Sequence, residues 1–428
     1  MNPSPVRVGI LGCGNVGAAL AELLLDQGDR IAADTGLRLE LVRVAVRSTA
    51  KERAFPIPDG VLTNDAGSVV NDPEVDVVVE VIGGIEPARS LILEALKAGK
   101  PVVTANKELL ANVGAELFEA AATAGVDLLF EASVGGGIPL IRPLRESLAG
   151  ERITRLMGIV NGTTNYILTR MTEAGASYSD ALAEAQSLGF AERDPTADVE
   201  GFDAGAKAAI LASIAFGSRV VAGDVYREGI SGVTAADIAF TARMGYVVKL
   251  LAIAERVGDE IAVRVHPTML PTTHPLASVR ESFNAVFIEG EAVGELMLYG
   301  RGAGGMPTAS AVLGDLIDAS HNLRSGGAGR TTPMERAVIH PVDEICSQYY
   351  LSLEVADRPG VARDVFGVTA DHDVSIVSME QEGLGDEARL ILITHKVPER
   401  AIQATLADLR DLDAVDRVGT LLRVVGQE

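Results

Sequence analysis

The segment 6-VRVGILGCGNVGA-18 decides the fold of the first part of the chain. Its first six residues form a short apolar run typical of a buried strand, and a helix is expected from about Ala18. The glycines between them follow G-x-G-x-x-G, which permits a tight turn and close approach of the backbone to a pyrophosphate. A glycine-rich turn without a ligand is the alternative. The segment predicts a dinucleotide site with contacts from Gly12, Gly14, Asn15, Val16 and Gly17.

The alternation of apolar runs and helix signals continues to about residue 139. Four further strands are predicted, at 39–46, 76–82, 101–107 and 127–130. A helix at 87–98 has proline in its first turn and glycine just past its end. Strands that alternate with helices predict a parallel sheet covered on both faces. We therefore expect an α/β fold that begins with an N-terminal Rossmann domain at residues 1–139.

Two strand ends in this domain carry residues suited to a cofactor. The second strand ends at Arg47, where a site that prefers NAD usually has a carboxylate for the ribose 2′-hydroxyl. Because an arginine can accept a 2′-phosphate, we expect NADP(H) to be preferred over NAD(H); a solvated arginine is the alternative. The strand at 101–107 ends in Thr104 and Lys107. Ligands of open α/β sheets bind at such strand ends, so both are candidate site residues.

A second segment, 188-LGFAERDPTADVEGFDAGAKAAILASI-214, places charges where a core is expected. Its second half is typical of a helix, in which Asp203 and Lys207 share a face with Ile210, Leu211 and Ile214. Burying charged side chains is costly unless they are paired. An Asp–Lys pair on a polar helix surface, worth about 0.3–0.5 kcal/mol, is the alternative. The apolar face favours a functional pair.

The same segment closely resembles the signature of the homoserine dehydrogenase family, G-[YF]-x-E-x-D-P-x-x-D-x-x-G-x-D-x-x-x-K. Every fixed position is filled, by Gly189, Phe190, Glu192, Asp194, Pro195, Asp198, Gly201, Asp203 and Lys207. The family also shares the T-A-N-K strand end at 104–107. The resemblance implies reversible hydride transfer between NAD(P)H and L-aspartate 4-semialdehyde, which gives L-homoserine on the route to threonine, methionine and isoleucine.

The resemblance also implies roles for single residues. Lys207 would donate the proton when the aldehyde is reduced and accept it in the reverse direction. Lys107 would sit near the same oxygen and reach the nicotinamide. Glu192 would hold the substrate ammonium, and Asp203 its hydroxyl end, with Asp198 adding a carboxylate at the mouth of the site.

Two glycine-rich turns belong to the same resemblance. From the residues alone, the turn at 131–139 is only a hinge between domains. In the family it holds a monovalent cation, usually sodium, and by position the ligands here would be Glu131, Val134, Gly136 and Ile138. The turn at 300–307 resembles the segment that closes over the nicotinamide, with Gly304 the best single candidate; a helix-entry turn is the alternative.

Three further regions follow the first domain. Residues 140–320 lose the regular alternation and are expected to form a mixed α/β substrate domain, and the Gly-rich, polar stretch 321–348 a flexible linker. Residues 349–428 have a βαββαβ order and a D-R-P-G-V turn, which resemble the ACT domain, a small amino-acid-sensing module. We expect L-threonine to bind near Asp357 and Gly360 and inhibit the distant site, so that truncation after about Ser347 leaves an active, unresponsive enzyme. An ACT domain that only helps the chain associate is the alternative.

Composition limits the other partners. The net charge of −22, from 37 basic and 59 acidic residues, argues against nucleic acid or an anionic membrane as the main partner. The two cysteines, Cys13 and Cys346, have neither metal-site nor disulfide spacing, which favours reduced thiols and a cytoplasmic protein. The chain shows no apolar run near the length of a membrane span and no room for a signal peptide. We expect a small-molecule substrate and a homodimer or homotetramer.

Two other classes of protein compete with this interpretation. An aspartate-semialdehyde dehydrogenase needs a nucleophilic cysteine in its second domain. Cys13 lies in the dinucleotide turn and Cys346 in the expected linker, which excludes that enzyme. A non-catalytic sensor built from Rossmann and ACT domains would not need Asp203 and Lys207 on an apolar face.

Overall fold

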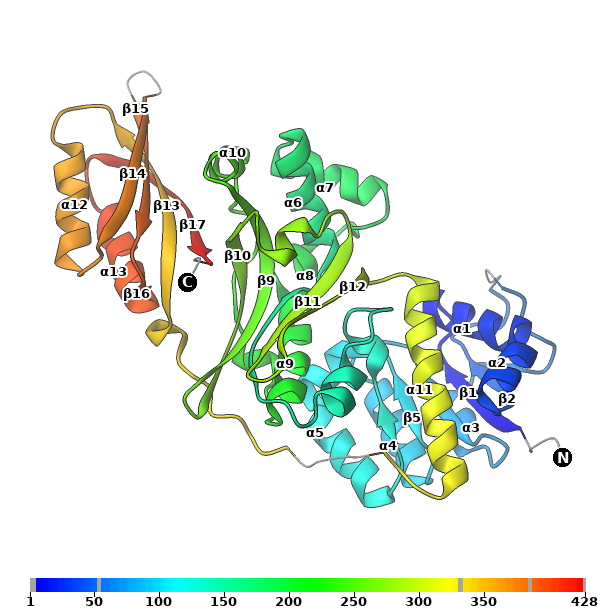
Figure 1. The fold of residues 1–428 in the computed structure, drawn as a ribbon. Coiled ribbons are helices and arrows are strands. Elements are labelled where there is room, and N and C mark those ends of the chain that lie inside the picture. Colours follow the sequence, from blue (N-terminus) through cyan, green and yellow to red (C-terminus); the bar gives the residue numbers. More distant parts are fainter. Residues whose placement is uncertain (1–4, 52–54, 330–333, 384–386, 426–428) are drawn as a thin grey trace. The chain divides into compact units, whose positions relative to one another are not determined.

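The computed structural model describes residues 5–51, 55–329, 334–383 and 387–425 (Figure 1). The chain divides into two compact units. The first contains Met1–Ile153, Ala209–Gly223 and Gly290–Ala337, and the second contains Thr154–Ala208, Asp224–Glu289 and Val338–Glu428.

The first unit is built on a parallel sheet with the strand order β3-β2-β1-β4-β5-β6. Its strands are β1 (Val6–Leu11), β2 (Leu39–Ala45), β3 (Leu62–Thr63), β4 (Val77–Glu80), β5 (Val102–Thr104) and β6 (Leu128–Leu129). The helices between them are α1 (Asn15–Asp26), α2 (Gly28–Thr35), α3 (Ala66–Asn71), α4 (Ala88–Lys97) and α5 (Lys107–Ala124). Strand order reverses between β1 and β4. Open α/β sheets bind their ligands at such a reversal, which confirms the predicted Rossmann-type domain and locates its crevice.

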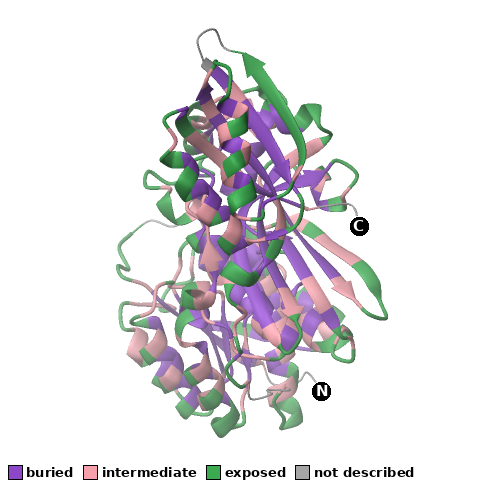
Figure 2. Cartoon of the chain, turned by 90° about the vertical axis from the view of Figure 1, so that its left-hand side faces the viewer, coloured by how far each residue is buried: buried purple, intermediate pink, exposed green. Residues whose placement is uncertain are grey.

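Both faces of this sheet are buried, because successive side chains of a strand point to opposite faces. Val8 and Ile10 of β1 pack in one apolar cluster, whereas Leu11 packs in the cluster on the other side with Val78 and Val102. Figure 2 shows the resulting concentration of buried residues along the strands. The near-continuous apolar runs in the sequence are therefore the signature of a sheet covered by helices on two sides.

A later helix completes the first unit. Helix α11 (Gly305–Ser325) contributes Val312, Leu316 and Ala319 to the cluster that contains β1 and α1, and it lies beside α1 in Figure 1. β12 (Gly294–Arg301), which precedes it, belongs to the same unit. This corrects two expectations. The helix joins the Rossmann core although residues 140–320 were expected to form a separate substrate domain, and it runs beyond residue 320, where a linker was expected, because its apolar spacing persists until Gly326 ends it.

The second unit is a long mixed sheet with helices packed on it. Its strands run in the order β11-β7-β9-β10-β17-β13-β15-β14, with β8 beside β10 and β16 beside β13. Their bounds are β7 (Ile153–Ile159), β8 (Tyr226–Arg227), β9 (Tyr246–Val257), β10 (Glu260–Pro271), β11 (Phe283–Gly290), β13 (Cys346–Ala356), β14 (Ile376–Gly383), β15 (Glu387–Thr394), β16 (Val397–Pro398) and β17 (Val415–Val424). The helices are α6 (Gly162–Ala174), α7 (Tyr178–Ser187), α8 (Thr196–Val199), α9 (Phe202–Phe216), α10 (Ala235–Arg243), α12 (Val361–Asp371) and α13 (Glu399–Arg410), and α9 continues into the first unit after Ala208.

The C-terminal βαββαβ module shares this sheet. Its last strand, β17, pairs in parallel with β10 at Thr268 and Met269. The module is therefore joined to the substrate region by backbone hydrogen bonds, and the expectation of a unit that only hangs on a flexible linker is wrong. Residues 330–333 of the expected linker lie outside the described residues, whereas Val338 within it accepts a hydrogen bond from the Ile261 N–H.

Candidate active site and cofactor site

The glycine turn after β1 has the backbone that a dinucleotide site needs. Gly12 has a φ of 104°, and a Cβ there would lie 2.8 Å from the Val81 carbonyl oxygen. A Cβ on Gly17 would collide with the carbonyl oxygen of Gly12. Only glycine fits either position, because the turn folds tightly between β1, β4 and α1. Gly14 caps α1 without a side chain, so the first-turn amides of the helix remain available to an anion.

The ends of β4 and β5, beside this turn, are joined by a buried glutamate, Glu80, that was not predicted from the sequence. Glu80 is fully buried at the end of β4 and accepts hydrogen bonds from the Ile82 and Gly83 amides. Its other oxygen accepts from the Thr104 hydroxyl at 2.6 Å. Thr104 in turn accepts from the amide of Asn106, which caps α5. The sequence feature that could have identified Glu80 is its position as a single acidic residue among the apolar residues 77–82.

The cofactor candidates occupy different parts of the first unit. Lys107 is the first residue of α5 and is half-buried, whereas Arg47 is exposed two residues after β2 ends. Gly304 caps α11 with a φ of 114°, and a Cβ on the next residue, Gly305, would lie 2.9 Å from the Asn15 carbonyl oxygen. The glycine turn at 300–307 thus packs directly against the glycine turn after β1, which places Gly304 beside the candidate dinucleotide site.

The Asp–Lys pair of α9 is buried, as its place on the apolar face predicted. Side-chain exposure is 11% for Lys207 and 6% for Asp203. The Lys207 ammonium donates to Asp203 Oδ2 at 2.6 Å and to the Val160 carbonyl at 2.7 Å. An ion pair in such a low-dielectric site is costly to break, because either charge left alone is desolvated without compensation.

Asn161 gathers the carboxylates around this lysine. Its amide group donates to Asp203 Oδ2 at 2.9 Å and to Asp198 Oδ1 at 2.7 Å. Thr163 donates to Asp198 Oδ2 at 3.2 Å. Asn161 and Thr163 were not among the residues predicted from the sequence. The missed signal was a polar N-G-T-T run at the end of an apolar strand, where Asn161 also caps α6 by accepting from Thr164.

Glu192 is placed differently from the other acidic candidates. It is exposed on the loop between α7 and α8, and its carbonyl accepts a hydrogen bond from the Gln186 side chain. The structure therefore brings Asp198, Asp203 and Lys207 into one hydrogen-bonded cluster and leaves Glu192 at the solvent edge of the same unit.

The residues of the turn at 131–139 suit a hard cation. Glu131 is 4% exposed and accepts hydrogen bonds from the amides of Ile141 and Arg142, each at 2.8 Å, and from the amide of Leu140. A carboxylate offers about four lone-pair positions, so Glu131 retains acceptor capacity. Val134, Gly136 and Ile138 are also buried, and their carbonyls supply further oxygen donors of the type that hard cations prefer. The described residues contain no cluster of three or more His, Cys, Asp or Glu arranged for a metal.

A buried carboxylate stabilises this turn from α11. Asp315 accepts from the Glu131 amide at 2.7 Å and pairs with Arg142 at 2.9 Å. Burial raises the pKa of Asp315 to about 7, against the opposing effects of the Glu131 amide and Arg142. Two buried carboxylates, those of Asp315 and Glu131, therefore accept hydrogen bonds from backbone amides of residues 131–142.

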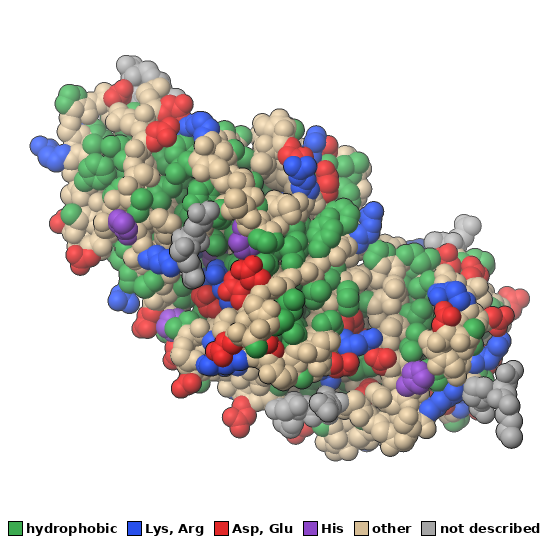
Figure 3. Space-filling view, in the orientation of Figure 1, with side chains coloured by type: hydrophobic (Ala, Val, Ile, Leu, Met, Phe, Trp, Pro, Cys, Tyr) green, Lys and Arg blue, Asp and Glu red, His purple; other side chains and the backbone are tan. Residues whose placement is uncertain are grey.

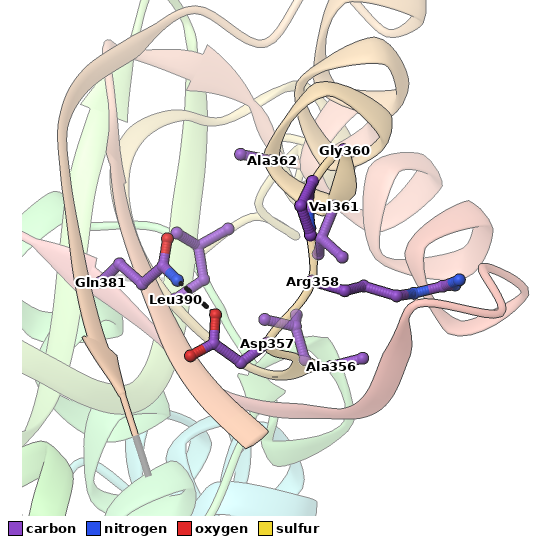
Figure 4. Close-up of a pocket in the computed structure, with 10 residues that line it drawn as sticks. Ala356, Asp357, Arg358, Gly360, Val361, Ala362, Gln381 and Leu390 are labelled. Carbon is purple, nitrogen blue, oxygen red and sulfur yellow. Dashed lines mark hydrogen bonds between the residues drawn. The ribbon is translucent and has the colours of Figure 1, made fainter. Parts of the chain in front are cut away.

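The C-terminal module contains a separate cavity of about 370 Å³ at the turn between β13 and α12 (Figure 4). Asp357 and Gln381 face one another across it, with Gln381 Nε2 3.4 Å from Asp357 Oδ1. Gly360 caps α12 with a φ of 100°, so the first amides of the helix line the same cavity. A carboxylate beside helix N-terminal amides is suited to a molecule that carries both an ammonium and a carboxylate group.

Comparisons with known proteins cover nearly the whole chain. Residues 12–131 match the homoserine dehydrogenase NAD-binding domain family, residues 139–317 the homoserine dehydrogenase family, and residues 349–414 the ACT domain family. Homoserine dehydrogenase from Mycobacterium tuberculosis is 49% identical, over 99% of this chain and 98% of its own. The crystal structure of a homoserine dehydrogenase from Thiobacillus denitrificans superposes with a TM-score of 0.93 at 42% identity, over 99% and 98% of the two chains.

A third relative is smaller. A hyperthermophilic archaeal homoserine dehydrogenase in complex with NADPH matches with a TM-score of 0.64 at 33% identity, over 74% of this chain and 98% of that chain. Fold and site together define an NAD(P)-dependent oxidoreductase with a C-terminal ACT domain. The chain belongs to the homoserine dehydrogenase family.

Acidic and basic side chains are interspersed on the face shown in Figure 3. In the part of the chain that the structure describes, helices are too short or too polar to cross a membrane.

Proposed function

We propose that the protein interconverts L-aspartate 4-semialdehyde and L-homoserine, on the route to threonine, methionine and isoleucine. The observation that carries the proposal is the buried Lys207–Asp203 pair with its Asn161 hydrogen bond. Bound NADP(H) supplies the hydride, and the protein supplies position and a proton. An ammonium held at one place beside an acceptor can protonate the oxygen of an aldehyde as it becomes an alcohol.

The acidic cluster divides the remaining work. Asp203 holds the Lys207 ammonium in one orientation and binds the hydroxyl end of the substrate. The Asn161 amide donates to both Asp203 and Asp198 and so fixes the position of the two carboxylates. Glu192, exposed at the solvent edge, binds the substrate ammonium, and Lys107 is assigned to the nicotinamide and the reacting oxygen.

NADP(H) is the proposed preferred cofactor, with NAD(H) also accepted. The exposed guanidinium of Arg47 follows β2, where a 2′-phosphate would lie, and the archaeal relative was solved with NADPH. The turn at 131–139 is proposed to hold Na⁺ through Glu131 and the carbonyls of Val134, Gly136 and Ile138. The turn at 131–139 already contacts the turn at 300–307, because the Gly137 amide donates to the Arg301 carbonyl. A cation bound there would stabilise this contact.

The cavity of the C-terminal module is the proposed site for L-threonine, the pathway's end product. Asp357 would bind its ammonium and the α12 amides its carboxylate. We also propose a homodimer or homotetramer located in the cytoplasm, because the spacing of Cys13 and Cys346 favours reduced thiols.

A spectrophotometric assay tests the activity. The purified protein with L-homoserine and NADP⁺ should produce NADPH, and the same mixture with D-homoserine should not. A Lys207→Ala variant is the matched enzyme control. A chain that binds NADP⁺ but produces no NADPH with L-homoserine would be a sensor and not a dehydrogenase.

A further inference from the structure

The C-terminal module reaches the substrate region through a buried ion cluster. Arg423 of β17 has 4% of its side chain exposed. Its guanidinium donates through both terminal nitrogens to the two carboxylate oxygens of Glu228, with Nη2 2.7 Å from Oε1. It also binds Glu399 at 2.7 Å and lies over the rings of Tyr226 and Tyr349. Burial alone would lower the pKa of Arg423, but the hydrogen bonds and charge of Glu228 raise it, so the cluster stays charged.

Glu228 lies in a segment that contacts the loop before α9. The Ile230 amide donates to the Val199 carbonyl at 2.8 Å. A Cβ on Gly229 would collide with that same carbonyl oxygen, and one on Gly201 would lie 3.4 Å from the Glu228 carbonyl oxygen. The backbones of segments 226–230 and 199–201 are therefore in direct contact, and a shift of one segment must move the other.

Arg227 extends the contact to α9 itself. Its guanidinium carbon lies 4.8 Å from the centre of the Phe202 ring, at the first residue of the helix. A Cβ on Gly205 would lie 2.7 Å from Arg227 Cδ, so the arginine stem packs on the helix two residues before Lys207. Neither Arg227 nor Phe202 was predicted from the sequence as a functional residue. Two adjacent side chains of segment 226–230 thus make contacts in different places, Arg227 with the first turn of α9 and Glu228 with Arg423 of β17.

We propose that Arg227 and Glu228 are positioning residues for Lys207, held in place from the C-terminal module by Arg423. The proposal rests on the assignment of Lys207 to proton transfer. Glu228 fixes segment 226–230 against β17, and Arg227 transmits that position to the first turn of α9. The Asp203–Lys207 geometry then depends on a strand that is more than two hundred residues away in the sequence.

Two pairs of variants test this role, each with a matched control. Arg227→Met keeps the apolar stem and removes the guanidinium. Its control is Arg243→Met, because Arg243 lies over the Phe240 ring at 5.1 Å on α10. Arg423→Gln breaks the buried cluster, and its control is Arg417→Gln on the same strand, which breaks the more exposed pair with Glu354. Arg423→Lys keeps the charge and serves if the glutamine variant does not fold.

A displaced catalytic group costs turnover more than binding, and a misplacement of about 1 Å can reduce the rate roughly 100-fold. We expect Arg227→Met and the Arg423 variants to lower kcat by about 10- to 100-fold with little change in the KM for NADP⁺. For oxidation of L-homoserine, in which Lys207 accepts the proton and must be neutral, the acidic limb of the kcat profile should move to lower pH, because the Lys207 ammonium loses part of its carboxylate partner. Both controls should keep the wild-type kcat and profile.

The outcomes separate this inference from the proposed function. If folded Arg227→Met and Arg423→Lys have the wild-type kcat and pH profile while Lys207→Ala is inactive, the positioning role is wrong and the function stands. Lower thermal stability with an unchanged pH profile would also reject it, since that is the result of a purely structural contact. If Lys207→Ala keeps its activity, the proposed function is what fails.

Discussion

The ammonium nitrogen of Lys207 lies 2.6 Å from Oδ2 of Asp203, one helical turn earlier on α9. The spacing makes the pair possible, but the burial makes it informative. A surface pair of this kind would contribute about 0.3–0.5 kcal/mol. Here both groups are desolvated, and the lysine is oriented by a second acceptor, the Val160 carbonyl. The ammonium is therefore fixed between two buried acceptors, which is the arrangement that supports the proposed role of Lys207 in proton transfer.

Lys207→Ala should lower kcat by about 10²–10⁴-fold, the usual contribution of one general acid–base group. The affinity for NADPH, measured by fluorescence titration, should stay nearly unchanged because the residue belongs to the substrate region. Asp203→Asn is the companion variant, since it keeps the shape of the side chain and removes the charge that orients the lysine. A Lys207→Ala enzyme with the wild-type kcat would remove this residue from the mechanism.

Periodicity and spacing predicted most of this arrangement. The strand-turn-helix segment at 6–18 predicted the Rossmann-type sheet, and the shared face of Asp203 and Lys207 predicted their burial. Local patterns act over a few residues, so the order of elements and the faces of helices could be derived from them. Asn161 could not be assigned in the same way, because its partners Asp198 and Asp203 come from elements 37 and 42 residues away.

Long-range packing accounts for the two corrections. Helix α11 joins the first core through a stripe of apolar residues that fits many partners, and no local pattern states which sheet it will cover. The pairing of β17 with β10 was missed for a similar reason. The residue pattern of a strand at the edge of a sheet does not differ from that of a strand that pairs with a neighbouring sheet. Arg423 was the available signal, because a charged residue in an apolar strand needs a buried partner.

Arg47→Asp should move cofactor preference toward NAD. The new carboxylate can bind the ribose 2′-hydroxyl and repels a 2′-phosphate. The ratio of kcat/KM for NADP⁺ to that for NAD⁺ should fall, with the kcat for each cofactor less affected. Arg43→Asp, at a position within β2, is the control, because Arg43 pairs with Asp72. A wild-type enzyme that prefers NAD⁺, or an unchanged ratio, would reject the assignment.

Lys249 should make stability rise with pH. This lysine is 4% exposed and donates to the Asn165 side chain and the Val279 carbonyl. Burial lowers its pKa from 10.5 to about 8. Between about pH 8 and 10.5 the unfolded chain holds a proton that the folded chain has released. The free energy of unfolding therefore increases with pH across this window, by up to about 3 kcal/mol.

Chemical denaturation of the wild type and Lys249→Met at several pH values between 7 and 10.5 measures this term. The methionine variant loses the donor to Asn165 at every pH, which is a constant cost, but its curve should lack the rise that the lysine produces. Lys97→Met, at an exposed position of α4, is the control and should follow the wild type. Parallel curves for the wild type and Lys249→Met would show that the lysine does not titrate in this window.

The shared sheet changes how the C-terminal module should be tested. Removing residues after Ser347 would expose the edge of β10 and remove Arg423, the ion-pair partner of the half-buried Glu228. A truncated enzyme that is active and unresponsive to L-threonine is still the expected outcome, but a loss of activity would not separate the loss of the cavity from the loss of these contacts. Substitutions inside the cavity leave the sheet intact and report on the ligand alone.

Asp357→Asn is that substitution, and it should weaken inhibition by L-threonine. It removes the negative charge that faces an ammonium but keeps the contact with Gln381. Losing a charged hydrogen bond of about 1.5–3 kcal/mol should raise the inhibition constant by roughly 10- to 150-fold while the uninhibited kcat stays unchanged. Asp364→Asn, on α12 outside the cavity lining, should keep wild-type inhibition. Coupling between two binding sites is reciprocal. The factor by which L-threonine changes the affinity for L-homoserine should therefore equal the factor by which L-homoserine changes the affinity for L-threonine, and calorimetry measures both. Wild-type activity that stays flat through millimolar L-threonine would leave the module as an assembly element.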